Sequence, residues 1–65
     1  MKNYLKEKRK EKKLTQPQLA ELSNLPSYTH IQRYEYGSVV PSVEVALRLA
    51  HALECKVEDL FELED

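Results

Sequence analysis

The sequence predicts an all-α domain of five helices, and three kinds of signal support this fold class. Thr15, Ser27 and Ser42 are residues that cap helix N-termini, and each stands directly before a run of helix-forming residues. Gly37 follows one of these runs, at the place where a glycine commonly ends a helix. Apolar residues repeat every four positions within residues 45–53, which is the spacing of one helix face.

The first expected helix spans residues 3–13. Its Lys, Glu and Arg residues are good helix formers, and Asn3 is an acceptable cap. The apolar content of this segment is thin. We therefore expect the aliphatic stems of Lys8, Arg9 and Lys12 to cover apolar surface where a stronger core would use leucine.

Residues 15–37 are the segment around which the chain is organised, as two short helices joined by a tight turn. The helices are expected over residues 16–23 and 28–36. The capping threonine and Gln18 can bond each other's amides reciprocally, and Pro26 pushes the residue before it out of helical geometry. Two helices separated by so few residues must cross steeply, which leaves one side of the second exposed. A short exposed helix of this kind is the shape that enters a DNA major groove.

The two faces of the second of these helices differ in character. Ile31 and Tyr34 lie on the face expected to be buried. The helix over residues 16–23 is expected to turn Leu19, Ala20 and Leu22 inward. The opposite face carries hydrogen-bonding side chains of several kinds: Tyr28, Thr29, Gln32 and Arg33. Such groups suit base edges, the thymine methyl and phosphate oxygens. From the residues alone, an ordinary solvated face remains the alternative.

The remaining chain is expected to form two more helices, over residues 43–53 and 57–62. We expect the loop before them to tuck Val39 and Val40 back to the core. Cys55, between the two helices, is interpreted as a small buried hydrophobe.

Charge is distributed unevenly along the chain. The net charge of −1 conceals +5 over residues 1–14 and −5 over residues 41–65. A chain polarised in this way has one end suited to phosphates and another that repels them. The alternative is that the lysine-rich first helix is only a solvated face.

The composition argues against several other functions. A single cysteine and two distant histidines, His30 and His51, give neither an internal disulfide nor metal-ligand spacing. No set of residues suggests a catalytic site, so we expect no enzyme activity, no metal and no cofactor. No apolar run approaches the roughly 20 residues of a membrane span, and the N-terminus has no apolar signal core. We therefore expect a cytoplasmic protein.

Several short motifs occur in a particular order along the chain. They are Leu14-Thr15-Gln16, Leu19-Ala20-Glu21, Ile31-Gln32-Arg33-Tyr34-Glu35, Gly37, Pro41-Ser42, the run 45–53 and Val57-Glu58-Asp59-Leu60-Phe61. In this order and spacing they resemble the Cro / lambda-repressor-like helix-turn-helix family, often called the xenobiotic-response-element type. The resemblance implies one compact five-helix domain over residues 1–65, usually dimeric, that represses or activates transcription by binding operator DNA.

The resemblance also implies roles for particular residues. Four positions match residues that face bases: Tyr28, Thr29, Gln32 and Arg33. Four more are expected to contact phosphates: Gln16, Ser27, Tyr36 and Ser38. Arg9 and Glu35 match a pair that forms a salt bridge between the first and third helices, and we assign this pair to structure.

Four features depart from the family pattern. The turn over residues 23–27 looks one residue longer than usual and lacks the common glycine. Lys8 stands where an apolar residue is usual, Lys13 where a glycine often ends the first helix, and Lys56 where a capping Ser or Thr often begins the fifth. None of these departures removes a DNA-contacting position.

A homodimer is expected because so small a chain buries only about 60% of its unfolded surface, and association adds stability. We assign the dimer interface to Leu60, Phe61 and Leu63. The resulting hypothesis is a transcriptional repressor that binds a palindromic operator in double-stranded DNA, with no small-molecule effector evident. The alternative is an antitoxin or another protein-binding module of the same shape.

Overall fold

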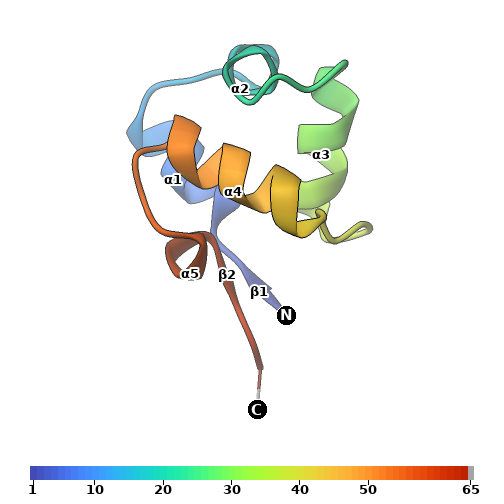
Figure 1. Cartoon of the computed structure of the whole chain (residues 1–65), viewed down its shortest axis with the longest axis vertical. Coiled ribbons are helices and arrows are strands. Elements are labelled where there is room, and N and C mark those ends of the chain that lie inside the picture. The colour runs from blue at the N-terminus through green and yellow to red at the C-terminus, as the bar shows by residue number, and fades with distance from the viewer. Residues whose placement is uncertain (65) are drawn as a thin grey trace.

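Five helices and one pair of very short strands form the fold over residues 1–64, the part of the chain that the computed structural model describes (Figure 1). The helices are α1 (Leu5–Glu11), α2 (Gln16–Leu22), α3 (Tyr28–Tyr36), α4 (Val43–Ala52) and α5 (Val57–Leu60). The strands are β1 (Lys2–Asn3) and β2 (Phe61–Glu62). The all-α prediction is confirmed, and α3 has the predicted bounds. Helices α2 and α4 each end one residue before the predicted end, and assignments of helix ends commonly differ by this much.

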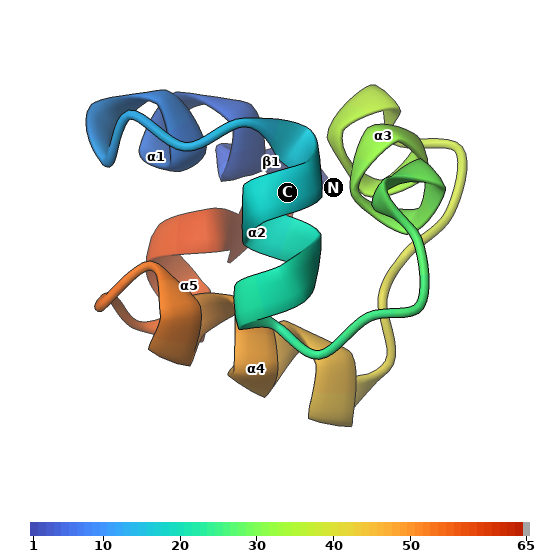
Figure 2. The ribbon, with the colours of Figure 1, turned by 90° about the horizontal axis from the view of Figure 1, so that it is seen from above.

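Each helix contributes one aliphatic side chain with no exposed surface to a shared core. These side chains are Leu5, Leu19, Ile31, Leu49 and Leu60. Seen from above, α2 lies in the middle and the other helices are arranged around it (Figure 2). Burying one such side chain stabilises a fold by about 1.5–3 kcal/mol. Every helix is therefore attached to the shared core by at least one fully buried side chain.

The strand pair joins the two ends of the described chain, and the sequence did not predict it. Its antiparallel register sets Lys2 against Glu62 and Asn3 against Phe61. The Tyr4 amide also donates to the Leu60 carbonyl at 2.8 Å. These backbone bonds correct two predictions, because they hold both segments extended. The helix predicted over 3–13 begins only at Leu5, and the one predicted over 57–62 stops at Leu60.

Helices α2, α3 and α4 start at the predicted capping residues, whereas α1 has Tyr4 and not the predicted Asn3 at its N-cap. The Gln18 amide donates to Thr15 Oγ1 at 3.2 Å, and the Thr15 amide donates to Gln18 Oε1 at 2.8 Å. Ser27 and Ser42 cap α3 and α4 through their hydroxyl oxygens. These bonds satisfy amides that have no partner within their helices.

Four helices end in the same way, with one residue in the left-handed region. The residues and their φ angles are Lys13 (58°), Asn24 (57°), Gly37 (90°) and Glu54 (56°). In each case the next amide donates back to a carbonyl five residues earlier, which closes the helix. Only the glycine adopts this conformation without steric cost. Lys13 therefore occupies a glycine-like position, as its place in the family pattern suggests.

Several apolar residues lie elsewhere than predicted. Leu22 is 60% exposed, because α2 turns Leu19, Ala20 and Ser23 inward and Leu22 points well away from their common direction. Val39 and Val40 are exposed as well, since the loop between α3 and α4 runs over the surface.

Two further predictions change at the C-terminal end. Leu60 belongs to the core, so it is not part of a surface that a second copy can reach. Phe61 is half-buried and Leu63 is exposed. Cys55, expected to be buried, is only partly so, although it packs against the core.

The left-handed position after α1 predicts a stabilising substitution. Lys13→Gly should raise the free energy of unfolding by about 0.5–1 kcal/mol, because glycine adopts this conformation without strain. Lys10→Gly, inside α1, is the matched control and should lower the free energy of unfolding by a similar amount. Urea denaturation followed by circular dichroism measures both. A loss of stability in Lys13→Gly would contradict the assignment.

Candidate nucleic-acid interface

Helix α3 lies at one edge of the domain, with one side against the core and the other uncovered (Figure 2). Ile31 and Tyr34 are buried and attach the helix to the core. At its start, the Thr29 amide donates to Ser27 Oγ at 3.1 Å. At its end, Gly37 closes the last turn. The helix is therefore held at both ends and along one side.

The uncovered side of α3 carries two rows of side chains spaced four residues apart. Tyr28, Gln32 and Tyr36 form one row, and Thr29 and Arg33 form the other. Tyr28 is 48% exposed and Tyr36 is 87% exposed, and Gln32 and Arg33 also face solvent. Thr29 is half-buried, and its hydroxyl accepts a hydrogen bond from the capping serine at 3.0 Å. Of the four residues predicted to contact bases, three are thus exposed and the fourth is partly covered.

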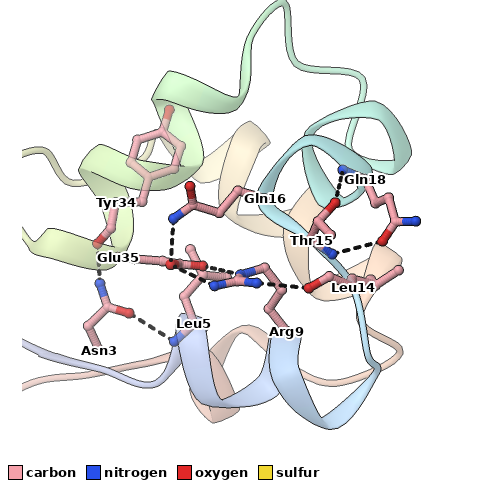
Figure 3. A network of polar contacts seen from close by, with 9 residues as sticks. All are labelled: Asn3, Leu5, Arg9, Leu14, Thr15, Gln16, Gln18, Tyr34 and Glu35. Atoms are coloured by element: carbon pink, nitrogen blue, oxygen red, sulfur yellow. Dashed lines mark hydrogen bonds and ion pairs between the residues drawn. The ribbon is translucent and has the colours of Figure 1, made fainter.

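A buried carboxylate behind this face, that of Glu35, joins three helices (Figure 3). Arg9 of α1 donates to it twice, from Nε to Oε2 at 2.6 Å and from Nη2 to Oε1 at 3.2 Å. The Nε2 of Gln16, at the start of α2, donates to the same carboxylate at 3.0 Å. Arg9 Nη1 also donates to the Leu14 carbonyl at 2.8 Å. The ion pair between α1 and α3 is therefore part of a network that also fixes the first turn of α2.

The four residues predicted to contact phosphates lie around α3. Ser27 stands at its start, Tyr36 and Ser38 at its end, and Gln16 at the start of α2. The Ser38 hydroxyl is exposed and donates weakly to the Arg33 carbonyl at 3.4 Å. Gln16 is half-buried, and within residues 1–64 its amide group bonds only to Glu35. Both side chains thus retain hydrogen-bonding capacity.

Sequence reasoning missed a second attachment of α3, made by Asn3. Its Nδ2 donates to the Tyr34 carbonyl, and its Oδ1 accepts from the Leu5 amide at 2.9 Å (Figure 3). Asn3 is thus bonded to both α1 and α3. No local signal in the sequence points to the bond between Asn3 and Tyr34, because these two residues are 31 positions apart.

Four cationic side chains without an ion pair to the described residues remain on α1, just after it and on α3. Three lysines of the N-terminal segment are engaged in ion pairs: Lys2 with Glu62, Lys8 with Glu11 and Lys12 with Glu54. Lys6, Lys10 and Lys13 form no ion pair with any described residue, and neither does Arg33. These four cations are therefore not neutralised inside the domain.

Three further observations concern metal binding, thiol reactivity and membrane crossing. They contain no group of three or more His, Cys, Asp or Glu side chains placed to hold a metal ion. Burial raises the pKa of the Cys55 thiol, which disfavours the thiolate form that acts as a nucleophile. None of the helices in residues 1–64 combines the length and the apolar character that crossing a bilayer requires.

Comparison with known proteins agrees with this geometry. A sequence model of the family described as "Helix-turn-helix" matches residues 5–60, which is most of the chain. The chain belongs to the Cro / lambda-repressor-like helix-turn-helix family. Within this helix-turn-helix domain, α2 and α3 are the two helices that give the family its name. The protein is accordingly a DNA-binding transcription regulator in general terms, from a family that is not enzymatic. A search of curated proteins finds no match.

The buried ion pair predicts a large effect of removing one partner. Arg9→Ala should lower the free energy of unfolding by about 3–5 kcal/mol, because it leaves the Glu35 carboxylate buried without its counter-charge. Lys6→Ala, on the exposed side of the same helix, should change it by less than about 0.5 kcal/mol. Thermal and urea denaturation test both variants. Equal stabilities for Arg9→Ala and Lys6→Ala would mean that the pair is energetically unimportant.

The raised thiol pKa predicts slow chemical modification of Cys55. Near pH 8, iodoacetamide should alkylate the folded protein more slowly than the same chain in urea, because less thiolate is present when the side chain is partly buried. Since Cys55 is the single cysteine of the chain, mass spectrometry reports its reaction directly. Faster modification in the folded state would show an activated thiol instead.

Proposed function

We propose that this protein is a sequence-specific repressor that binds a palindromic operator in double-stranded DNA as a homodimer. The observation that carries the proposal is the uncovered side of α3, where polar side chains stand on a helix whose other side is held by the core. A major groove admits a helix of this size, and its base edges offer donors and acceptors to such side chains. We place its action in the cytoplasm, with residues 1–65 working as one unit.

Each base-contacting residue has a distinct proposed role. Arg33 suits bidentate donation to a guanine, and Gln32 suits an adenine. Tyr28 contacts a thymine methyl or a phosphate. The Thr29 hydroxyl already accepts a bond from Ser27, so its methyl group is the part left for apolar contact with a thymine. This mixture of hydrogen-bonding and apolar groups favours recognition of a particular base sequence over uniform attraction to DNA.

The phosphate contacts flank this reading surface. Ser27, Tyr36 and Ser38 lie at the two ends of α3, and Gln16 lies beside it on α2. Contacts to phosphates fix the register and orientation of a protein on the duplex without reading sequence. Glu35 supports this arrangement, because its bond to Gln16 holds that side chain in place from behind. The unpaired lysines of α1 add affinity that falls with salt concentration.

A homodimer matches the symmetry of a palindromic operator. Two copies related by a two-fold axis insert their α3 helices into successive major grooves, about 34 Å apart. Each half-site then contributes the same contacts, so affinity for the full operator greatly exceeds that for one half. Bound in this way across a promoter, the dimer blocks transcription.

The proposed reading role of Arg33 predicts a loss of both affinity and discrimination. On the operator selected from a pool of random duplexes, Arg33→Ala should weaken binding by about 1–3 kcal/mol and relax the preference at one position of each half-site. Lys12→Ala is the matched control, because it also removes an exposed cation, but one that already pairs with Glu54. Its binding should equal that of the unaltered protein.

The selection itself tests the wider proposal. A palindromic consensus with half-sites one turn apart supports the homodimer and its operator. A footprint that is unchanged in the combined variant Arg33→Ala and Tyr28→Ala would refute the assigned reading surface. Retention of a dominant protein partner, without any duplex at low salt, would favour the antitoxin-like alternative.

A further inference from the structure

One side chain, that of Asn3, bonds the end of α3 to the start of α1 (Figure 3). Its Nδ2 donates to the Tyr34 carbonyl, and its Oδ1 accepts from the Leu5 amide at 2.9 Å. Only one orientation of the amide group serves both partners, because reversing it would place oxygen against the carbonyl and nitrogen against the amide. The contact therefore requires a donor and an acceptor on one short side chain, and asparagine provides both.

Both partners of Asn3 are groups that their own helices leave without a bond. The first amides of a helix and its last carbonyls have no partner inside the helix. Leu5 is the first residue of α1, and Tyr34 lies in the last turn of α3. The amide that would continue the helical pattern at Tyr34, that of Ser38, donates instead to the Arg33 carbonyl at 3.2 Å. Asn3 thus takes the place of a missing helical partner.

The backbone of Asn3 is itself held by the strand pair. Asn3 lies opposite Phe61 in the antiparallel register, and the next amide, that of Tyr4, donates to the Leu60 carbonyl at 2.8 Å. Leu60 has no exposed surface and belongs to the core. Because its backbone is fixed to the core in this way, the Asn3 side chain imposes a position on the end of α3 and does not merely follow its movements.

The last turn of α3 carries side chains that the proposed function assigns to DNA. Arg33 stands one residue before Tyr34, and Tyr36 and Ser38 follow it. Tyr36 is 87% exposed, so its side chain adds little packing that could fix the backbone there. The Ser38 hydroxyl donates only weakly, at 3.4 Å, to the Arg33 carbonyl. Order in this turn therefore depends on its backbone bonds, and one of the acceptors is the carbonyl that Asn3 holds.

We propose that Asn3 is a positioning residue for DNA binding: its side-chain amide orders the last turn of α3 and so holds Tyr36 and Ser38 toward the phosphate backbone. The inference rests on the proposed function and deepens it by adding a residue that need not touch DNA. A turn that is ordered beforehand does not have to be ordered at the moment of binding, which raises affinity without a further contact. Base contacts from the first turn, at Tyr28 and Thr29, do not depend on this bond.

Two substitutions separate the bond to α3 from the bond to α1. Asn3→Asp keeps an acceptor for the Leu5 amide, but the ionised carboxylate has no donor for the Tyr34 carbonyl. Asn3→Ser can also accept from an amide two residues on, but its hydroxyl is too short to reach the other helix. Asn24→Asp is the matched control, because it adds the same charge at an exposed asparagine in the turn before α3. Agreement between the two Asn3 variants excludes the added charge as the cause.

The single glycine of the chain gives a direct readout of the bond. The Gly37 amide donates to the Arg33 carbonyl at 3.0 Å and to the Tyr34 carbonyl at 3.2 Å, so it shares an acceptor with Asn3. Protein labelled only at glycine nitrogen therefore shows one backbone amide resonance, that of Gly37. In both Asn3 variants this resonance should shift, and its hydrogen exchange should be roughly three- to tenfold faster, which is the effect of losing one hydrogen bond. In Asn24→Asp it should be unchanged.

Binding to the selected operator tests the positioning role. Both Asn3 variants should bind roughly three- to tenfold more weakly than the unaltered protein and Asn24→Asp, while selecting the same bases. The loss caused by Tyr36→Ala should be smaller in the Asn3→Ser background, because the misplaced ring contributes less there. The loss caused by Tyr28→Ala should be the same in both backgrounds, since that residue lies at the other end of α3. A purely structural role of Asn3 would lower stability but would not produce this difference.

Four results would overturn the inference, and circular dichroism first establishes that the variants are folded. An unmoved Gly37 resonance in Asn3→Asp and Asn3→Ser would show that the side chain does not order the turn. Operator affinity equal to that of the unaltered protein would show that this order does not serve binding, while the proposed function stands. Equal coupling of Asn3 to Tyr28 and to Tyr36 would show a general loss of structure instead. If the unaltered protein binds no duplex, the proposed function and the positioning role both fall, even where the Gly37 resonance shifts.

Discussion

The carboxylate of Glu35 is the constraint on which the arrangement of the first three helices depends. It is buried, so its charge must be compensated within the fold, and Arg9 supplies two donors for that purpose. The third donor, Gln16, comes from a different helix. A single charged group thus relates α1, α2 and α3 to one another. An apolar side chain at this position would add burial but would impose no such directional requirement.

Because contacts on its inner side hold α3 in place, the outer side of this helix need not contribute to stability. The helix is held from behind by Ile31, Tyr34 and the carboxylate network, and Asn3 bonds to its backbone near the end. The exposed side chains are then free to be chosen for what they contact. Most of the proposed DNA contacts therefore lie on a side that the fold does not use, whereas the buried core lies on the other side.

The ends of the helices are likewise held by a few hydrogen bonds. Four of them close through a left-handed residue, and only one of those residues is a glycine. The domain tolerates the strain at Lys13, Asn24 and Glu54 because the backbone bonds that follow each of them are formed. Asn24 shows how the turn between α2 and α3 works without the glycine common in the family, since asparagine enters this region more readily than most residues.

The sequence by itself determined the starts of α2, α3 and α4, the break at Pro26, the bounds of α3 and the two sides of that helix. These follow from capping bonds, proline geometry and periodicity, which act over a few residues. Only the tertiary structure decided that Phe61 is extended and that Leu22 is exposed, because such outcomes depend on partners distant in the chain. The bond from Asn3 to the Tyr34 carbonyl also depends on the tertiary structure. The pocket lined by Met1, Leu47 and Phe61 is another such outcome, because these residues come from distant parts of the sequence.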